Sequence, residues 1–280
     1  MFSFEPPTIL VDGSYLLHRT YHAVPPMYSH DGNSTNAVYG TIKHILHMLN
    51  EVHPTYIAVV IDRSEPSFRH KLSPLYKADR PPYPEDFTSQ IPWVIAILEA
   101  LGITVVSIAG VEGDDALGTL AHMAVNAGED VVIATADKDM MQLVNDSISL
   151  RDTFKGSNID REAVFQKFGV YPEHIADLLA LMGDKADGIV GVPGVGKVSA
   201  ANLIWEYGGI PGIVENAAVI PGAVGIRIRS GLDNIALDRK LTGIVTDMNL
   251  GVTMEDLRVQ PTDTVKLDAL YRQLNFNSLL

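Results

Sequence analysis

The sequence predicts an α/β protein in which a mostly parallel central sheet, flanked by helices, is followed by a helical second part. In the first half, short apolar runs of strand length alternate with segments of helical periodicity, which is typical of a parallel sheet covered on both faces. In the second half the strand-like runs stop, and helical patterns surround a glycine-rich turn. We therefore expect a first part over 1–158 and a second over 159–280.

The expected elements follow one another at short intervals. Apolar runs predict strands at 8–12 (TILVD), 55–62 (TYIAVVID), 103–109 (ITVVSIA), 130–136 (DVVIATA) and 147–150. Apolar residues at helical spacing predict helices over 38–52, 90–101, 114–127, 162–168 and 172–182, with an amphipathic helix at 265–280. The Gly- and Pro-rich stretch 210–225 is the segment we expect to be flexible.

The composition restricts the class of protein. Hydrophobic residues make up 46% and charged residues 20%, as in globular proteins. No apolar run approaches the ~20 residues needed to span a bilayer, and the first residues do not have the pattern of a signal peptide. With no cysteine, a disulfide framework and a thiolate zinc site are excluded. We expect a bacterial-type cytoplasmic protein with no membrane partner.

The formal net charge of −13 contrasts with the basic surface of most nucleic-acid-binding proteins. A sum over the whole chain does not describe the field at any one place, so the positions of the acids matter more than their number. The histidines are scattered singly, and we expect them to be surface or core residues rather than metal ligands.

Acidic residues follow several of the predicted strands. Asp12 and Asp62 end the first two, and Asp137 follows the fourth. Any one of these acids could be a helix cap or a turn residue, but no capping rule places acids after three separate buried strands. Ligands of open α/β sheets bind beyond the carboxyl ends of the strands, so these side chains are expected to meet there. Carboxylates so close together repel, and they either take up protons or bind cations.

Further acids extend this set. Three follow the third strand in the segment VEGDD, one follows Asp137 by two residues, and two follow the helix at 172–182. An all-oxygen ligand set suits Mg²⁺ or Mn²⁺, and two such ions about 4 Å apart can activate water and stabilise the leaving oxygen of a phosphodiester. The expected metal ligands are Asp12, Asp62, Glu112, Asp114, Asp115, Asp137, Asp139, Asp184 and Asp187.

The motifs VEGDD, TADKD and LALMGDKADGIVGVPGVG resemble those of the 5′ nuclease domain of bacterial DNA polymerase I and its flap-endonuclease relatives. The resemblance runs in order from ILVDGSYLLHRTYHA through YKADRPP to LDALYRQLNF. It implies a PIN-like nuclease core, a helical arch at about 64–90, and a helix-hairpin-helix (H3TH) DNA-binding subdomain with C-terminal helices packed on the core.

The resemblance also implies an activity. Members of this family hydrolyse phosphodiester bonds at 5′ flaps and 5′ ends of branched or nicked DNA, in Okazaki-fragment processing and repair. By position, the first metal ion would be held mainly by the first five acids of the set and the second by the last four. Because the full set of acids is present, we expect an active nuclease. The resemblance also leads us to expect a monomer that is associated with the nucleoid.

The chain departs from the family pattern at three places. Gly113 stands where Ala is common, and we expect this change to matter little. Gly188 stands where Asn is frequent, which would remove one polar contact. In the hairpin, Lys197, Val198 and Ser199 replace the common Glu-Lys-Thr, so the phosphate contact there stays open.

The long insertion after the second strand is basic in its middle and rich in aromatic residues. A basic segment above a metal pair can draw in a single strand and add positive charge at the scissile phosphate. We expect Lys77 and Arg80 to stabilise the transition state, Arg69 to position a phosphate, and Tyr76 to stack on an unpaired base. The alternative is a solvated loop whose aromatic residues belong to the core.

The turn GVPGVG lacks the Gly-Lys-Ser/Thr ending of a P-loop, but its backbone N–H groups can bind a phosphate. The resemblance implies a K⁺ ion on the carbonyl groups of Val192 and Val195. Lys185 is either a salt-bridge partner or a DNA contact. The expected DNA-binding residues are Gly191, Val192, Gly194, Val195, Gly196, Lys197, Ser199 and Lys185.

Two other functions stay open. A non-catalytic DNA-binding module would bind a flap without cutting it in Mg²⁺. A metal-dependent ribonuclease of similar sheet architecture would share the acids, and the sequence does not distinguish DNA from RNA.

Overall fold

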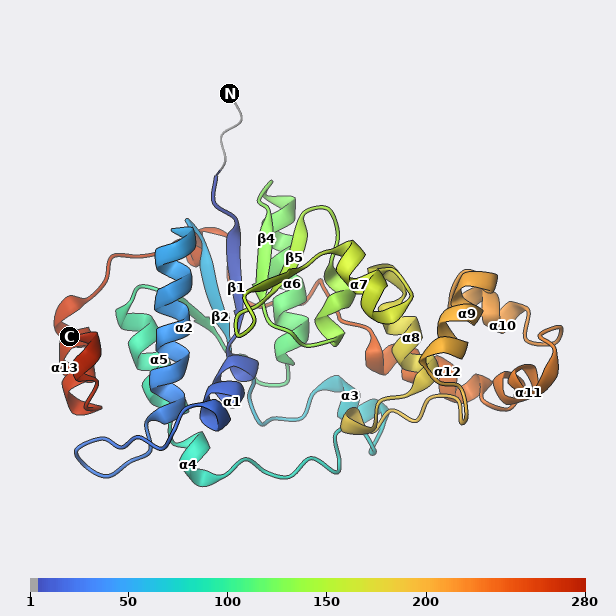
Figure 1. Ribbon diagram of the computed structural model, residues 1–280, viewed down its shortest axis with the longest axis horizontal. Coiled ribbons are helices and arrows are strands. Elements are labelled where there is room, and N and C mark those ends of the chain that lie inside the picture. The colour runs from blue at the N-terminus through green and yellow to red at the C-terminus, as the bar shows by residue number, and fades with distance from the viewer. Residues whose placement is uncertain (1–4) are drawn as a thin grey trace.

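The computed structural model describes residues 5–280, and its centre is a six-stranded sheet in the order β3-β2-β1-β4-β5-β6 (Figure 1). The first five strands are parallel, and β6 runs antiparallel to β5. The expected mostly parallel sheet is confirmed. The strand β6 was not predicted, because its sequence SNI is short and polar. The strands are β1 Thr8–Asp12, β2 Ile57–Val60, β3 Thr104–Val106, β4 Val131–Ala134, β5 Ile148–Asp152 and β6 Ser157–Ile159.

Helices cover both faces of the sheet because successive residues of a strand point to opposite sides. Ile9 and Val11 of β1 belong to a core formed with α1, α2, α5 and α13, whereas Leu10 belongs to a core formed with α6. The helices bounding these cores are α1 Gly13–Ala23, α2 Asn36–Val52, α5 Ile91–Ala100, α6 Gly113–Asn126 and α13 Thr264–Gln273.

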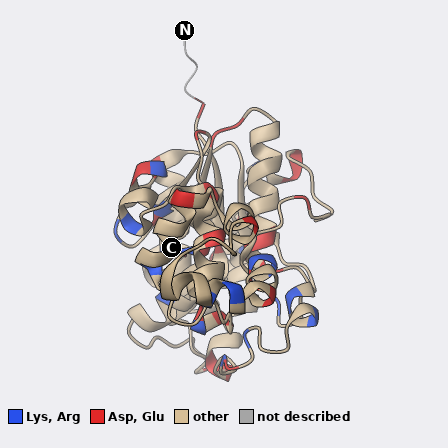
Figure 2. Cartoon of the chain, turned by 90° about the vertical axis from the view of Figure 1, so that its right-hand side faces the viewer, with Lys and Arg blue, Asp and Glu red and all other residues tan. Residues whose placement is uncertain are grey.

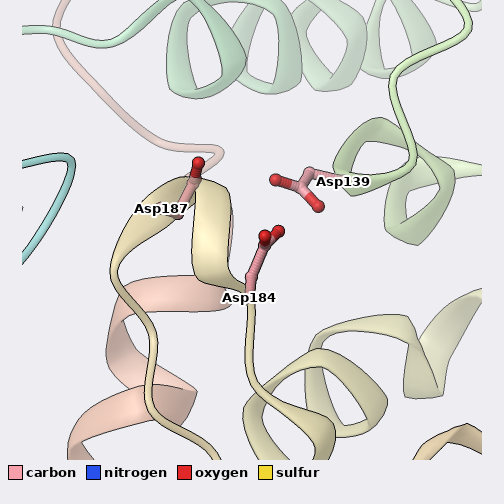
Figure 3. Close-up of side chains that lie close together, drawn as sticks. All are labelled: Asp139, Asp184 and Asp187. Carbon is pink, nitrogen blue, oxygen red and sulfur yellow. The ribbon is translucent and has the colours of Figure 1, made fainter. Parts of the chain in front are cut away.

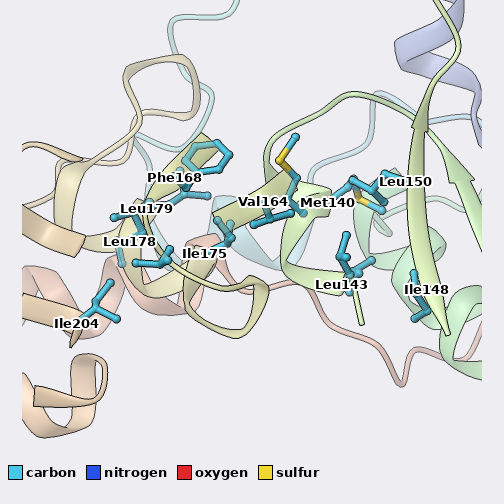
Figure 4. Close-up of a cluster of buried hydrophobic side chains, with 14 of the residues drawn as sticks. Met140, Leu143, Ile148, Leu150, Val164, Phe168, Ile175, Leu178, Leu179 and Ile204 are labelled. Carbon is cyan, nitrogen blue, oxygen red and sulfur yellow. The ribbon is translucent and has the colours of Figure 1, made fainter. Parts of the chain in front are cut away.

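The core on the α6 face continues without interruption into the helical second part. Figure 4 shows Leu150 and Ile148 of the sheet in the same cluster as Phe168, Leu179 and Ile204 of the later helices. One continuous apolar core therefore joins the two parts. The later helices are α7 Arg161–Phe168, α8 Ile175–Met182, α9 Lys197–Tyr207, α10 Ile210–Glu215, α11 Gly222–Ser230 and α12 Leu232–Thr242.

Several elements differ from expectation. The segment 210–225 forms α10 and the start of α11, because Ile210, Ile213 and Ile220 are buried. The last long helix ends at Gln273, and Asn275 has a φ of 64°. Short 3-10 turns lie at Asp139–Leu143, Pro172–His174, Lys185–Asp187, Glu255–Leu257 and Asn277–Leu279.

The helix α1 was not predicted. Its first residue, Gly13, follows β1 directly and resembles a turn residue in the sequence. The side chain of Asp12 caps the helix by accepting the N–H of Tyr15 at 2.9 Å.

The arch region holds two short helices, α3 Phe68–Leu72 and α4 Glu85–Thr88. The stretch 73–84 between them consists of turns and extended chain and crosses the lower edge of the molecule in Figure 1. Prolines at 81, 82 and 84 explain why no helix continues there. Among residues 5–280, no helix has both the length and the apolar character needed to cross a membrane.

Candidate metal centre

The first acids meet where the strand order reverses between β1 and β4, which is where open α/β sheets bind ligands. Asp12 ends β1, and its carboxylate accepts hydrogen bonds from the N–H of Tyr15 at 2.9 Å and the hydroxyl of Thr135 at 3.0 Å. Burial and the neighbouring charges of Asp62 and Asp137 raise the pKa of Asp12 to about 7. The sheet therefore concentrates negative charge at this edge, as expected for a cation site.

Asp114 extends this group from the first turn of α6. Burial, followed by the charges of Asp137, Asp12 and Asp139, raises its pKa well above the ordinary value. Asp114 is therefore close enough to Asp12, Asp137 and Asp139 for their charges to act on it.

Asp62 is held by the start of the same helix. Its Oδ1 accepts the N–H of Gly113 at 2.6 Å, and a Cβ at position 113 would lie 2.9 Å from its Oδ2. An alanine there would press on the carboxylate of an expected ligand. Asp62 is exposed and its carboxylate can move slightly, so the expectation that this position matters little stays a prediction.

A second group brings together acids from distant parts of the sequence. Figure 3 shows Asp139, which follows β4, facing Asp184 and Asp187, which follow α8. One carboxylate oxygen of each lies within 4.8 Å of the others. Burial and the charges of Asp137 and Asp187 raise the pKa of Asp139 to about 7.

This second group fits a divalent cation. Within residues 5–280, the buried Oδ1 of Asp139 has no hydrogen-bond partner, and an unsatisfied buried carboxylate oxygen is a strong acceptor for a cation. The donors are all oxygens, the ligand type preferred by Mg²⁺ and Mn²⁺.

Basic side chains lie between and beside the acids. Arg80 pairs with Asp187 at 2.5 Å, and Lys138 pairs with Asp184 at 2.5 Å. Lys138 was missed by the sequence reasoning, although its position between the two acids of TADKD was a usable signal. Arg80 is half-exposed, with 49% of its side chain accessible, so its guanidinium can meet an incoming anion.

Glu112 is held by residues 67–77, which we call the base of the arch. Its carboxylate accepts the hydroxyls of Tyr76 at 2.8 Å and of Ser67, and it pairs with Lys77 at 2.5 Å and Arg69 at 3.2 Å. Burial alone would raise its pKa, but Lys77 and Arg69 lower the pKa of Glu112 to about 2. Glu112 is therefore ionised at any physiological pH.

Two of the arch residues do not lie on a DNA-facing surface. Arg69 is 3% exposed and Tyr76 is 4% exposed. Tyr76 packs with Ile189 and Leu241, as the core alternative stated. In this arrangement neither side chain can reach a phosphate or a base, so the roles expected for them stay predictions without geometric support.

The glycine-rich turn connects the acids to α9. Lys185, Gly194, Gly196 and Lys197 are exposed there. Gly196 is the N-cap of α9 and has no side chain to cap it, which leaves N–H groups of the first turn available. Of the other expected DNA contacts, Ser199 is half-buried, and the buried ones are Gly191, Val192 and Val195.

The backbone of this turn is held by Asp238, a residue that the sequence reasoning missed. The buried carboxylate of Asp238 in α12 accepts the N–H of Gly191 at 2.7 Å. From α11, Arg227 donates to the carbonyl of Gly194 at 2.9 Å. The carbonyl of Val192, one of the two expected to hold K⁺, already accepts the N–H of Val195.

Acids at the carboxyl edge of a parallel sheet, with a second acid group and basic side chains beside them, are the arrangement expected of a metal-dependent phosphodiester hydrolase. Residues 7–169 match the family model described as 5′-3′ exonuclease, N-terminal resolvase-like domain. Residues 170–265 match 5′-3′ exonuclease, C-terminal SAM fold. The chain belongs to the 5′-3′ exonuclease family, and the expected family and enzyme class are confirmed.

Curated relatives fall into two kinds. The chain is 40% identical to DNA polymerase I of Pseudomonas aeruginosa over 99% of its own length, but it spans only 31% of that polymerase. It is 34% identical to the 5′-3′ exonuclease of Buchnera aphidicola, and the match covers 99% of each protein.

Solved structures confirm the fold. A bacteriophage T5 5′-exonuclease with bound zinc ions has a TM-score of 0.76 at 19% identity, covering 95% of this chain and 99% of that one. A T5 flap endonuclease in complex with DNA and metal ions has a TM-score of 0.74 at 18% identity, covering 96% and 99%. The expected nuclease core with a helical second part is therefore correct.

Proposed function

We propose that this chain is a structure-specific 5′ nuclease that hydrolyses phosphodiester bonds at 5′ flaps and 5′ ends of branched or nicked DNA. The proposed roles are Okazaki-fragment processing and DNA repair. The observation that carries the proposal is the convergence of Asp139 with Asp184 and Asp187 beside the acids of the sheet edge. The T5 neighbour solved with DNA and metal ions supports it.

The acids are proposed to hold two divalent cations, Mg²⁺ or Mn²⁺. Asp12, Asp62, Glu112 and Asp114 would serve the first, and Asp137 with the second group would serve the other. When bound, such ions supply an activated water and neutralise charge on the scissile phosphate. The two groups lie near each other because α8 packs on the turn Asp139–Leu143 that follows β4.

Arg80 and Lys77 are proposed to act on the phosphate as it gains charge. Arg80 is half-exposed beside Asp187, and 20% of the Lys77 side chain is accessible beside Glu112. Cations fixed in this way stabilise developing negative charge without reorganising. Lys77 is paired with Glu112 and Arg80 with Asp187, so each cation would leave its carboxylate to bind a phosphate oxygen.

The glycine-rich turn and α9 are proposed to hold the DNA backbone, chiefly through the exposed Gly194, Gly196 and Lys197. In Figure 2, which faces the α9–α11 end of the molecule, Lys and Arg are interspersed with Asp and Glu. This favours phosphate contacts at a few fixed positions over a broad basic surface. A K⁺ ion at the turn, the monomeric state, the cytoplasmic location and the division at 158/159 remain predictions.

The decisive test is a labelled 5′-flap DNA incubated with Mg²⁺ and, separately, with EDTA. Cutting in Mg²⁺ that stops in EDTA is expected, whereas a bound but intact flap in Mg²⁺ would establish the non-catalytic alternative. An RNA flap of the same sequence tests the ribonuclease alternative, since faster cutting of RNA would favour it. Asp139→Asn should abolish cutting, and Asp146→Asn, at an exposed acid of a nearby turn, is the matched control.

A further inference from the structure

A buried ion pair connects the base of the arch to the helix that carries Glu112 and Asp114. Asp115 is fully buried, and Arg69 is 3% exposed. The Nη1 of Arg69 lies 2.6 Å from Oδ2 of Asp115, and its Nη2 lies 2.8 Å from Oδ1. Two parallel bonds of this kind fix the direction of both side chains.

The remaining hydrogen bonds of the pair reach a third segment of the chain. Arg69 donates from Nε to the carbonyl of Leu241 at 2.9 Å and from Nη2 to that of Gly243 at 2.7 Å. Asp115 Oδ1 also accepts the N–H of Val245 at 2.9 Å. With the contact to Glu112, all five N–H groups of Arg69 are used.

Asp114 and Asp115 face different surroundings although they are adjacent. Neighbouring residues of a helix point about 100° apart. Asp114 lies among Asp12, Asp137 and Asp139, whereas the oxygens of Asp115 are directed to Arg69 and to the backbone of Val245. The hydrogen bonds fill most of the acceptor capacity of the Asp115 carboxylate.

We propose that Asp115 is a positioning residue and not a direct metal ligand. Together with Arg69 it fixes α6 against the arch base and the segment 241–245, and this holds Glu112 and Asp114 in place for the metal ions. The inference rests on the proposed nuclease function. It also gives Arg69 a structural task in place of the phosphate contact expected from the sequence.

The experiment separates ligation from positioning by counting bound metal. Mn²⁺ binding is measured by calorimetry and electron paramagnetic resonance for wild type, Asp114→Asn, Asp115→Asn and Arg69→Lys. Asp115→Asn and Arg69→Lys should keep the wild-type number of Mn²⁺ ions and lose about 10- to 100-fold in affinity, the usual effect of disturbing a group that orients ligands. Asp114→Asn should lose a bound ion.

Kinetics and a double variant complete the test. For Asp115→Asn and Arg69→Lys, kcat on flap DNA should fall with KM nearly unchanged, and combining the two should be no worse than the more severe single variant. Arg151→Lys is the matched control and should behave as wild type, because Arg151 of β5 forms its ion pair with Glu51 of α2, away from the acids.

Two results would overturn the proposal. The first is an Asp115→Asn protein that loses a Mn²⁺ ion as Asp114→Asn does, while Arg69→Lys binds normally. The second is additive effects of the two changes on thermal unfolding in EDTA. That unfolding measurement needs no cutting, so it stands even if wild type proves not to be a nuclease. Arg69→Lys keeps the charge, which keeps the test informative if Asp115→Asn folds poorly.

Discussion

Gly188 offers a sharp test of how the arch base is attached to the second acid group. Its φ is +69°, and a Cβ built on it would lie 2.0 Å from the carbonyl oxygen of Leu75. Beside this contact, the N–H of Lys77 donates to the carbonyl of Asp187 at 2.9 Å. Gly188→Asn should push the backbone at 75–77 away and break that hydrogen bond.

The size of the effect can be separated into two parts. A side chain in left-handed backbone costs roughly 1–2 kcal/mol, at the lower end for Asn. Loss of the backbone hydrogen bond adds about 1 kcal/mol, and displacement of the packed chain adds to this. Gly156 is the matched control, since its φ is +67° and a Cβ there meets nothing within 4 Å. Gly156→Asn should show only the first part.

The assay is urea unfolding of both variants together with amide hydrogen exchange at Lys77. We expect Gly188→Asn to be less stable than Gly156→Asn by about 1–2 kcal/mol, with faster exchange at Lys77. Its flap cleavage should also slow, because Lys77 and Arg80 are displaced from the acids. Equal losses of stability in the two variants, with unchanged exchange, would refute the reasoning.

Three further outcomes are expected. The pKa values of Asp12 and Asp139 are raised from 3.8 to about 7, so between these values the folded protein without divalent ions binds more protons than the unfolded chain. Its stability should therefore fall as pH rises from about 4 to about 7, by up to about 1.4 kcal/mol per pH unit per group, and level off above that. A thermal midpoint in EDTA that rises from pH 5 to pH 8 would contradict this. Asp115→Asn removes the charge that pairs with the buried Arg69 and should lower the free energy of unfolding by as much as about 3–5 kcal/mol, the scale for breaking a buried ion pair. Urea unfolding measures this loss, and a value below ~1 kcal/mol would argue against a tight pair. Asp238→Ala removes the acceptor of the Gly191 N–H and should raise the Kd for flap DNA. Single-turnover cutting at saturating enzyme should stay close to wild type. An unchanged Kd would show that the turn keeps its shape without this hydrogen bond.

Local patterns were enough to predict the sheet and the first acid group. The strands of a parallel sheet are buried on both faces, so TILVD and DVVIATA stand out as apolar runs, and the acids that end them share one edge by topology alone. That group therefore followed from the residues themselves, before any resemblance was considered.

The second acid group could not be derived in this way. Asp139 and Asp187 are brought together by the packing of α8 on the turn after β4, which depends on tertiary contacts between distant residues. They were expected to be metal ligands from their positions in the sequence, but only the resemblance assigned them to a second metal ion. The burial of Arg69 and Tyr76 could not be predicted for a related reason, because a basic aromatic segment has the same sequence whether it faces solvent or the core.

The contacts that Asp184, Asp187 and Arg69 make with distant parts of the chain have a consequence for the order in which the protein is made. The chain emerges from the ribosome with β1 to β4 first, yet Asp184 and Asp187 follow only with α8, and the carbonyl groups that hold Arg69 lie at 241 and 243. A nascent chain that ends before α8 has the acids of the sheet edge, but it has neither the complete second acid group nor the carbonyl groups that hold Arg69. The ability to cut DNA is therefore expected to arise late in synthesis, after the arch and the glycine-rich turn have been made.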